Sequence, residues 1–468
     1  MSGQLRLSPY LPFAALLLAN FMEVLNHMFV NISMPVVSRQ LHASDTITHW
    51  VFSSYALGFA LTLVLTGSMA DRIGHRRIFL TGAALFVLAS LACAMSDQIT
   101  PFLLARVAQG AAFAMTAPQV MGLLHILYTP EQRVKLLPAL GFASASAGTF
   151  GPVAAGFLIT ANWMDMGWRT VFLGSACIGL VSFLLGFWLL PRHTQGQTGT
   201  AMPKGRWGLA LVVALIMALF EWLGRGEQGF QPWMLAALAL PVIAVLLLRK
   251  WQREQRETEG QAIDPDAKRQ LVTGAMLTIC FSASSNSLLI IVNHIMQTTL
   301  GRSPSLSGAM LIPYGLGVFF SILCFGRYLL KPNGRFVLAT GASLLMIAAP
   351  LIIWASAQTQ LPLWALLPIL GLAGVGVGMT SGCIGPASLA RMPTAYAGTG
   401  AATLRLGQQI GLAFGGAMIM RPYFHAAQLH DTMPSLPPHL MTMLLVLATA
   451  VTLALHFPKP LFPRHRQG

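Results

Sequence analysis

Charged side chains are scarce in this sequence. Only 9% of its 468 residues are Asp, Glu, Lys or Arg, whereas 55% are hydrophobic and the mean hydropathy is +0.65. A soluble domain carries about a quarter of its residues as charged groups, so a chain this poor in charge could not cover a folded surface against water. We therefore expect an integral membrane protein whose solvent is lipid.

Cysteine is scarce as well, and no catalytic constellation is present. The five cysteines lie inside apolar segments without CxxC spacing, which excludes a disulfide framework and a zinc site. No Ser/His/Asp set and no pair of carboxylates shares a predicted surface, so we expect neither an enzyme nor a metal or organic cofactor. The net charge of +15 does not indicate a nucleic-acid partner, because the basic residues are dispersed in short loops between apolar runs.

Apolar runs long enough to cross a bilayer, which takes about 20 residues, recur along the whole chain. Six lie near 10–37, 49–70, 78–96, 101–127, 134–160 and 168–190. Six more lie near 271–296, 305–329, 335–356, 361–388, 394–420 and 438–457, with two shorter runs between the sets at 207–223 and 231–248. We predict an all-α integral membrane fold of 14 transmembrane helices. Its parts are a six-helix bundle (1–191), a linker with two extra helices (192–269), and a second six-helix bundle with a short tail (270–468).

The basic residues alternate between the two sides of the predicted spans. If both termini are cytoplasmic, 22 of the 29 Lys and Arg lie in cytoplasmic segments and five in external loops, and Arg106 and Arg405 lie within spans. Positive charge is retained on the cytoplasmic side of a membrane, so this imbalance supports both the helix count and the orientation. The external five are Arg39, Arg169, Arg225, Arg302 and Arg421.

Two basic turns indicate an internal duplication. GSMADRIGHRR (67–77) follows the second predicted span, and GRYLLKPNGR (326–335) occupies the matching place in the second bundle, without the acid. Repeated halves around a site at the membrane midplane are how many secondary transporters are organised.

The first span carries polar residues where lipid contact would favour apolar ones. Asn20, Glu23, His27 and Asn31 fall within one sector of the helix, and Asn26 flanks it. The opposite face is apolar, so we expect the polar sector to face water or other helices and to line a substrate cavity.

Glu23 is the one carboxylate deep in any of the twelve outer spans. Burial favours the neutral form of a carboxyl group, which suits reversible proton uptake. The alternative is a structural ion pair with Arg106 of the fourth span, whose guanidinium cannot lose its proton and needs a partner. His27, one turn after Glu23, could relay the proton or simply pack. Gln109 and Phe113 share the face of Arg106 and are further cavity candidates.

The seventh outer span repeats this pattern with neutral groups. Ser282, Asn286 and Asn293 lie along one face, either as a hydrogen-bonding wall opposite the first span or as polar contacts between helices. Arg405, in the eleventh outer span with Gln409, has no obvious acid near it in the sequence. It could bond backbone carbonyls or bind a substrate anion.

The segment 50–80 resembles the major facilitator superfamily, specifically its fourteen-helix drug:proton antiporter branch. Its loop GSMADRIGHRR matches the superfamily signature between the second and third helices, which implies two bundles of major facilitator type and a conformational latch that accompanies alternating access. Asp71 of this loop can pair with basic groups or cap a facing helix. The matching residues are Gly67, Asp71, Arg72, Gly74, Arg76 and Arg77.

Further segments carry the same resemblance. LLARVAQGAAFA (103–114) is similar to the family's fourth-helix motif, in which the arginine, here Arg106, is linked to proton transfer. GTGAATLRLGQQIG (398–411) is similar to the eleventh core helix of the branch. GFASASAGTFGPVAAG (141–156) resembles the fifth-helix motif of antiporters, which implies export; glycine there permits close helix contact and proline bends the helix. Its matching residues include Gly148, Gly151, Pro152 and Gly156.

The first span departs from the pattern of the branch. In LNHMFVNISMP (25–35), Asn26 stands where the branch carries Asp and Met28 where it carries Thr, while Asn31 and Pro35 remain. The acid stands at Glu23 instead. The departure implies a coupling carboxylate that has moved within the cavity, an altered stoichiometry, or an atypical substrate.

These observations together predict a proton-coupled secondary active exporter, an antiporter of lipophilic or amphiphilic small molecules with protons as the coupling ion. Its partners would be the lipid bilayer and the small-molecule substrate, and we expect a monomer in the inner membrane of a bacterium. A dedicated exporter of one metabolite on the same fold and a non-transporting membrane sensor are the alternatives.

Overall fold

The computed structural model describes residues 10–43, 47, 50–191, 265–325, 334–357, 362–392, 397–428 and 438–457, and these residues form helices and connecting turns without any strand. The two central spans predicted at 207–223 and 231–248 lie outside the described residues. We refer to the helices before residue 192 as the N-half and to those after residue 264 as the C-half.

The N-half contains six long helices. They are α1 (Leu11–Gln40), α3 (Trp50–Ile73), α4 (His75–Ala94), α5 (Ile99–Leu127), α6 (Pro130–Ala161) and α7 (Arg169–Leu189). In the C-half, irregular turns divide two of the six predicted spans, and a third span ends in a π-helical turn. The elements of the C-half include α10 (Pro265–His294), the π-helical turn η2 (Ile295–Thr299), α11 (Pro304–Met310), α12 (Ile312–Phe325), α13 (Arg335–Ala357), α14 (Leu366–Leu389), α15 (Ala397–Gly415), the π-helical turn η6 (Gly416–Met420), α16 (Arg421–Gln428) and α17 (Pro438–Leu455).

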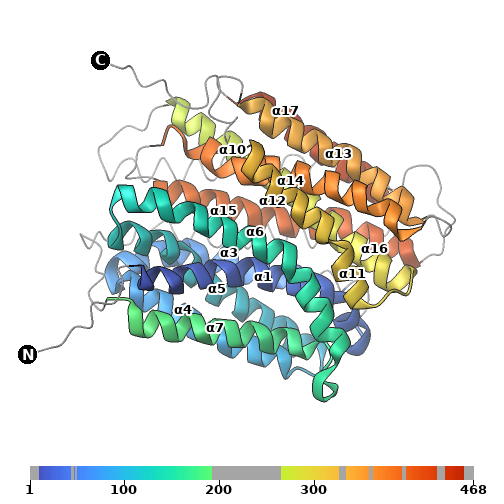
Figure 1. Cartoon of the computed structure of the whole chain (residues 1–468), viewed down its shortest axis with the longest axis horizontal. Coiled ribbons are helices and arrows are strands. Elements are labelled where there is room, and N and C mark those ends of the chain that lie inside the picture. Colours follow the sequence, from blue (N-terminus) through green and yellow to red (C-terminus); the bar gives the residue numbers. More distant parts are fainter. Residues whose placement is uncertain are drawn as a thin grey trace, which may run out of the picture.

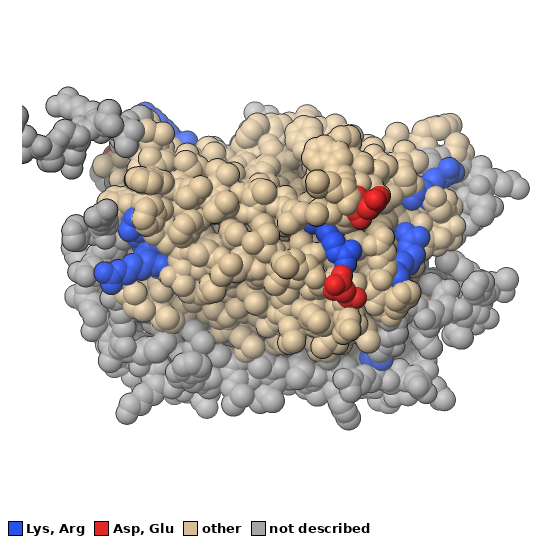
Figure 2. All heavy atoms as spheres, turned by 90° about the horizontal axis from the view of Figure 1, so that it is seen from below, with Lys and Arg blue, Asp and Glu red and all other residues tan. Residues whose placement is uncertain are grey.

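Every one of the twelve predicted outer spans is helical where the structure describes it. Eight of the described helical segments are long and apolar enough to cross a membrane, and two shorter apolar helices accompany them. Figure 2 shows one long side of the molecule, on which charged atoms gather toward the two ends and leave an uncharged band between them. The chain is therefore a multi-pass membrane protein.

Two predicted loops are wrong. Asp71 lies in the last turn of α3, because that helix runs to Ile73 and α4 begins at His75. The only residue between them is Gly74, which has a φ of +99° that other residues rarely adopt. Arg421 begins α16 and is not in an external loop, because the eleventh span continues through η6 to Gln428.

The helices of each half pack mainly on one another, and a smaller set of contacts joins the halves. α4 packs on α5 and α7, and α1 on α6 and α7, while α14 packs on α12 and α13, and α10 on α15 and α17. Between the halves, α6 contacts α11 and α12, α3 contacts α15, and α1 contacts α10. Figure 1 shows α1 and α10 running in the same direction along the long axis.

Equivalent contacts recur in the two halves, as the internal duplication predicts. Gly110 of α5 lies against the carbonyl group of Tyr55 on α3, and Gly374 of α14 lies against the carbonyl group of Tyr314 on α12. Each glycine allows two helix backbones to approach at a point where no side chain fits.

The two basic turns also have equivalent roles. Arg76, at the start of α4, donates to the carbonyl oxygen of Phe187 near the end of α7 over 2.6 Å. Arg335, at the start of α13, donates to the carbonyl oxygen of Leu455 at the end of α17 over 2.7 Å. A cation at the carbonyl end of a helix satisfies free acceptors and opposes the helix dipole. The two basic turns thus hold equivalent helix ends together, each within its own half.

We expect Gly374→Ala to destabilise the fold, because its Cβ would lie 2.7 Å from the carbonyl carbon of Tyr314. Overpacking of this kind costs about 1–3 kcal/mol. Gly385→Ala on the same helix is the matched control, since a Cβ there meets no atom within 4 Å. Melting of the purified protein in detergent measures both. Equal melting temperatures for the two variants would contradict the packing described here.

Candidate functional site

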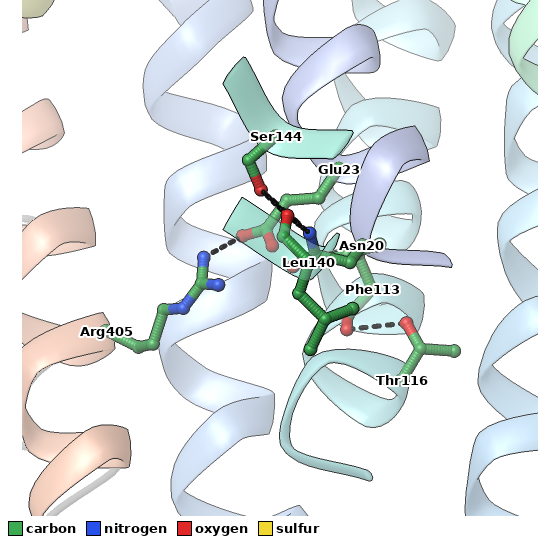
Figure 3. Close-up of polar contacts among 7 residues, drawn as sticks. All are labelled: Asn20, Glu23, Phe113, Thr116, Leu140, Ser144 and Arg405. Atoms are coloured by element: carbon green, nitrogen blue, oxygen red, sulfur yellow. Dashed lines mark hydrogen bonds and ion pairs between the residues drawn. The ribbon is translucent and has the colours of Figure 1, made fainter. Parts of the chain in front are cut away.

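The polar side chains of α1 reach three different neighbours. Asn20 donates to the carbonyl oxygen of Leu140 over 3.0 Å and to the hydroxyl of Ser144 over 2.7 Å, both on α6 (Figure 3). Glu23 and His27 point to the C-half, and Asn26 points into the N-half. The polar sector predicted from the sequence therefore makes contacts with helices of both halves.

Glu23 forms an ion pair with Arg405 of α15, in which Nη1 of the guanidinium donates to Oε1 of the carboxylate (Figure 3). The side chain of Glu23 is 14% exposed and that of Arg405 is 39% exposed. The pair joins α1 of the N-half to α15 of the C-half. Burial between helices makes such a pair costly to separate unless one partner loses its charge or finds another.

Arg106 does not pair with Glu23, and the predicted partnership of these two residues is wrong. Its Nε donates to the carbonyl oxygen of Val51 over 3.1 Å, its Nη1 donates to Oε1 of Gln109, and its guanidinium lies 4.6 Å from the ring centre of Tyr55. Among the described residues no carboxylate lies within ion-pair distance of it. The cation is instead held by neutral oxygens and an aromatic face, at 1% exposure.

Gln109 connects this cation to α1. Its Nε2 donates to the hydroxyl of Ser90 over 2.7 Å and to Oδ1 of Asn26 over 3.3 Å, and Ser175 donates to the same Oδ1 over 3.3 Å. Asn26 therefore belongs to a buried network within the N-half. Asn26 is neutral and bonds within the N-half, whereas Glu23 pairs with Arg405 of the C-half. The sequence around Arg405 contains no acid that would have predicted this pair.

The wall predicted on α10 does face α1. His27 Nε2 lies 3.2 Å from Oδ1 of Asn286, and Asn293 donates to the backbone carbonyl of Asn31 over 2.6 Å. The Cβ of Ser282 lies beside Gly411, where α10 packs on α15.

Several predicted cavity residues are packing residues in this structure. Phe113 is 1% exposed, with its ring 6.2 Å from that of Phe59 and 6.1 Å from that of Phe86. Asn31 and Asn293 are also buried. Gln409 is buried on α15, with its Oε1 lacking a hydrogen-bond partner.

The segment resembling the antiporter motif lies where α6 meets both α1 and α11. A Cβ at Gly151 would lie 2.9 Å from Cβ of Met28, and one at Gly156 would meet the carbonyl oxygen of Pro304. The carbonyl of Pro152 lies against Gly308 of α11. Gly148 has more space, with Val24 at 3.9 Å from a Cβ. The motif thus permits a close crossing between the halves.

The residues of the predicted latch are only partly described. The side chains of Asp71 and Arg72, and the surroundings of Gly67, lie outside the described residues. Arg76 bonds to α7 of its own half, as stated above, and Arg77 is exposed. Arg76 thus stabilises the N-half, and the latch between the halves stays a prediction. Within the described part of the chain, no group of three or more His, Cys, Asp or Glu is placed to bind a metal.

We expect Arg106→Lys to lower the stability of the protein, because a lysine cannot reach Val51 and Gln109 while also stacking on Tyr55. Leaving buried acceptors unpaired costs about 1–3 kcal/mol. Arg169→Lys is the matched control. Arg169 also stacks on an aromatic ring, that of Trp168, but its partner Asp97 is exposed, so its pair contributes little. Melting temperatures in detergent compare the two, and equal losses would contradict the assigned network.

Comparison with known proteins agrees with this architecture. The chain is 31% identical over 414 residues to the puromycin resistance protein pur8 of Streptomyces alboniger, covering 86% of this chain and 80% of that protein. It is 29% identical over 438 residues to the tetracenomycin C resistance and export protein of Streptomyces glaucescens, covering 89% and 76%. The fold is similar to the crystal structure of a D-xylose-proton symporter, with a TM-score of 0.64, 15% identity, and coverage of 96% and 98%. The model of the Major Facilitator Superfamily matches residues 16–416, and the chain belongs to that transporter family.

Proposed function

We propose that this protein is a proton-coupled exporter, an antiporter of lipophilic or amphiphilic small molecules that works by alternating access in a bacterial inner membrane. The observation that carries the proposal is the Glu23–Arg405 ion pair between the halves. The relatives named for antibiotic resistance and export support the direction of transport. The charge distribution supports cytoplasmic termini.

The ion pair supports coupling because it opposes separation of the halves where they meet. Alternating access moves one half against the other around a central site. While Glu23 and Arg405 are paired, that movement must separate two opposite charges in a medium of low dielectric constant. A proton on Glu23 removes the attraction. A substrate that takes the place of Arg405 at the carboxylate removes it as well. A bound proton or a bound substrate thus allows the two halves to move, whereas the ion pair restrains them when neither is bound. Obligatory exchange requires this difference.

The charges of the pair also bear on the substrate. The empty pair is neutral, and binding a proton or a monovalent cation gives the same net charge of about +1, so the two ligands compete for one carboxylate. An anion on Arg405 would instead be repelled by ionised Glu23 and favoured by protonated Glu23. Protons and anions would then bind together, which opposes antiport. Cationic or neutral amphiphiles are therefore the substrates that this site supports for proton-driven export.

The other predicted site residues receive distinct roles in this proposal. His27 contacts Asn286 across the interface, next to the ion pair, and can pass a proton or a hydrogen bond between the halves. Arg106 supports the N-half from within the network of Gln109 and Asn26 and sets the local electrostatic potential. A dedicated exporter of one metabolite would use the same pair, and a panel of substrates separates it from a multidrug exporter.

We expect Glu23→Gln to abolish accumulation of substrate driven by a pH gradient in proteoliposomes, while exchange of a neutral amphiphile down its own gradient persists. The amide can neither bind nor release the proton, and its neutrality mimics the protonated state. Asp97→Asn is the control, because it also removes a carboxylate from an ion pair with arginine, but at an exposed position within the N-half. Full gradient-driven transport by Glu23→Gln would remove this residue from the mechanism.

We expect the apparent affinity for a lipophilic cation to fall as the pH is lowered, by up to about tenfold per pH unit for one competing proton. The affinity for an anionic analogue of similar size should rise over the same range, because protonated Glu23 leaves Arg405 without its internal partner. Glu23→Gln should remove both dependences. Equilibrium binding to the purified protein at a series of pH values measures this, and a cation affinity insensitive to pH would contradict competition at Glu23.

A further inference from the structure

The backbone of α1 presents an acceptor that its own helix cannot satisfy. Pro35 lies inside α1 and has no N–H, so the carbonyl of Asn31, four residues earlier, has no donor from the helix. An unsatisfied carbonyl at membrane depth is costly unless another group donates to it. In this structure the donor comes from the other half of the protein.

Two amide side chains of the C-half donate to this stretch of α1. Nδ2 of Asn293 lies 2.6 Å from the carbonyl oxygen of Asn31, and Nε2 of Gln297 lies 2.9 Å from the carbonyl oxygen of Ile32. Gln297 Nε2 also lies 2.9 Å from Oδ1 of Asn293, which fixes the two amides relative to each other. Gln297 belongs to the π-helical turn η2 that directly follows α10. The wider turn changes the register of the helix, and such turns occur often at functional positions.

The contact is buried, and two of its oxygen atoms have no hydrogen-bond partner. Asn31, Ile32, Asn293 and Gln297 are all at most 3% exposed. Yet Oδ1 of Asn31 and Oε1 of Gln297 have no hydrogen-bond partner. Unpaired buried acceptors lose hydration without compensation, and water entering between the helices would satisfy both. The closed contact therefore joins the halves through two hydrogen bonds, and opening it would let water reach the two unpaired oxygens.

We propose that Asn293 and Gln297 form a gate with the carbonyls of Asn31 and Ile32, and that Pro35 creates the gate by freeing the first of these carbonyls. The gate lies toward the ends of α1 and α10, beyond Glu23 along α1, so it closes one side of the site. Opening exchanges two inter-helix hydrogen bonds for hydration of four polar groups. This assigns the two asparagines predicted as substrate-cavity residues to the control of access.

The gate can be tested by distance measurement in lipid nanodiscs without substrate or pH gradient, so that the result does not depend on proton coupling. Spin labels at Gln40 and Thr299, exposed positions at the ends of α1 and η2, report the separation of the halves at this end in a background without native cysteines. The double variant Asn293→Leu with Gln297→Leu removes both donors. We expect the ratio of short-distance to long-distance populations to fall about tenfold.

Pro35→Ala tests the same gate without altering either amide. Alanine returns an N–H that competes for the carbonyl of Asn31, so we expect a shift in the same direction but smaller, about threefold. Pro350→Ala is the matched control, because Pro350 also lies inside a helix, α13, which packs within the C-half. Thr170→Val is the control for the amides, since the Thr170 hydroxyl donates to the Leu158 carbonyl within the N-half.

Size-exclusion chromatography and melting identify any variant that is misfolded, and Pro35→Ala keeps every side chain of the gate in place. The proposal holds if both gate variants shift the distances and neither control does. It is overturned if either gate variant keeps the distances of the original protein, or if a control shifts them as much as its matched gate variant.

Discussion

The ion pair between Glu23 and Arg405 is the interaction on which the proposed coupling depends, because it places opposite charges on the two halves of the protein. Glu23 is largely buried, and its pairing with the partly exposed Arg405 offsets the cost of burying that negative charge. The pair links α1 of the N-half to α15 of the C-half. Any ligand that changes the charge of Glu23 changes how the halves associate, which is the physical basis of the proposed coupling.

The two arginines within the spans solve the same problem in different ways. Arg106 is enclosed within one half, where carbonyl, amide and aromatic groups surround it and no movement between the halves needs to disturb them. Arg405 is partly exposed and bound to a group of the opposite half. The first arrangement suits a permanent support. The second suits a contact that is broken and remade. Because Asn26 in the Arg106 network is neutral, Glu23 is the acid to which we assign the proton in the proposed mechanism.

Along α1, the contacts with the C-half change in character from one turn to the next. Glu23 makes an ion pair, His27 makes a neutral side-chain contact, and the carbonyls of Asn31 and Ile32 accept from amides. The ion pair responds to charge, whereas the amide contacts respond to water. The close crossing of α6 with α11, where Gly156 and Gly308 stand against backbone, supplies a surface on which the halves can meet without bulky side chains.

The sequence by itself determined that the chain lies in a membrane, where its twelve outer helices fall, and that Glu23 and the two arginines need partners, because hydropathy and buried charge are local properties of a chain in lipid. Its duplicated basic turns also predicted the repeat that Arg76 and Arg335 display. Only the tertiary structure decided which partner each group takes. Residues 23 and 405 are 382 positions apart. A helical face allows several neighbours, so spacing favoured Arg106, whereas the arrangement of the two halves brings Arg405 to Glu23. Likewise, a proline inside a helix predicts from sequence alone that the carbonyl four residues earlier lacks its helical donor. Which side chain donates to that carbonyl instead depends on how α10 and η2 pack beside α1.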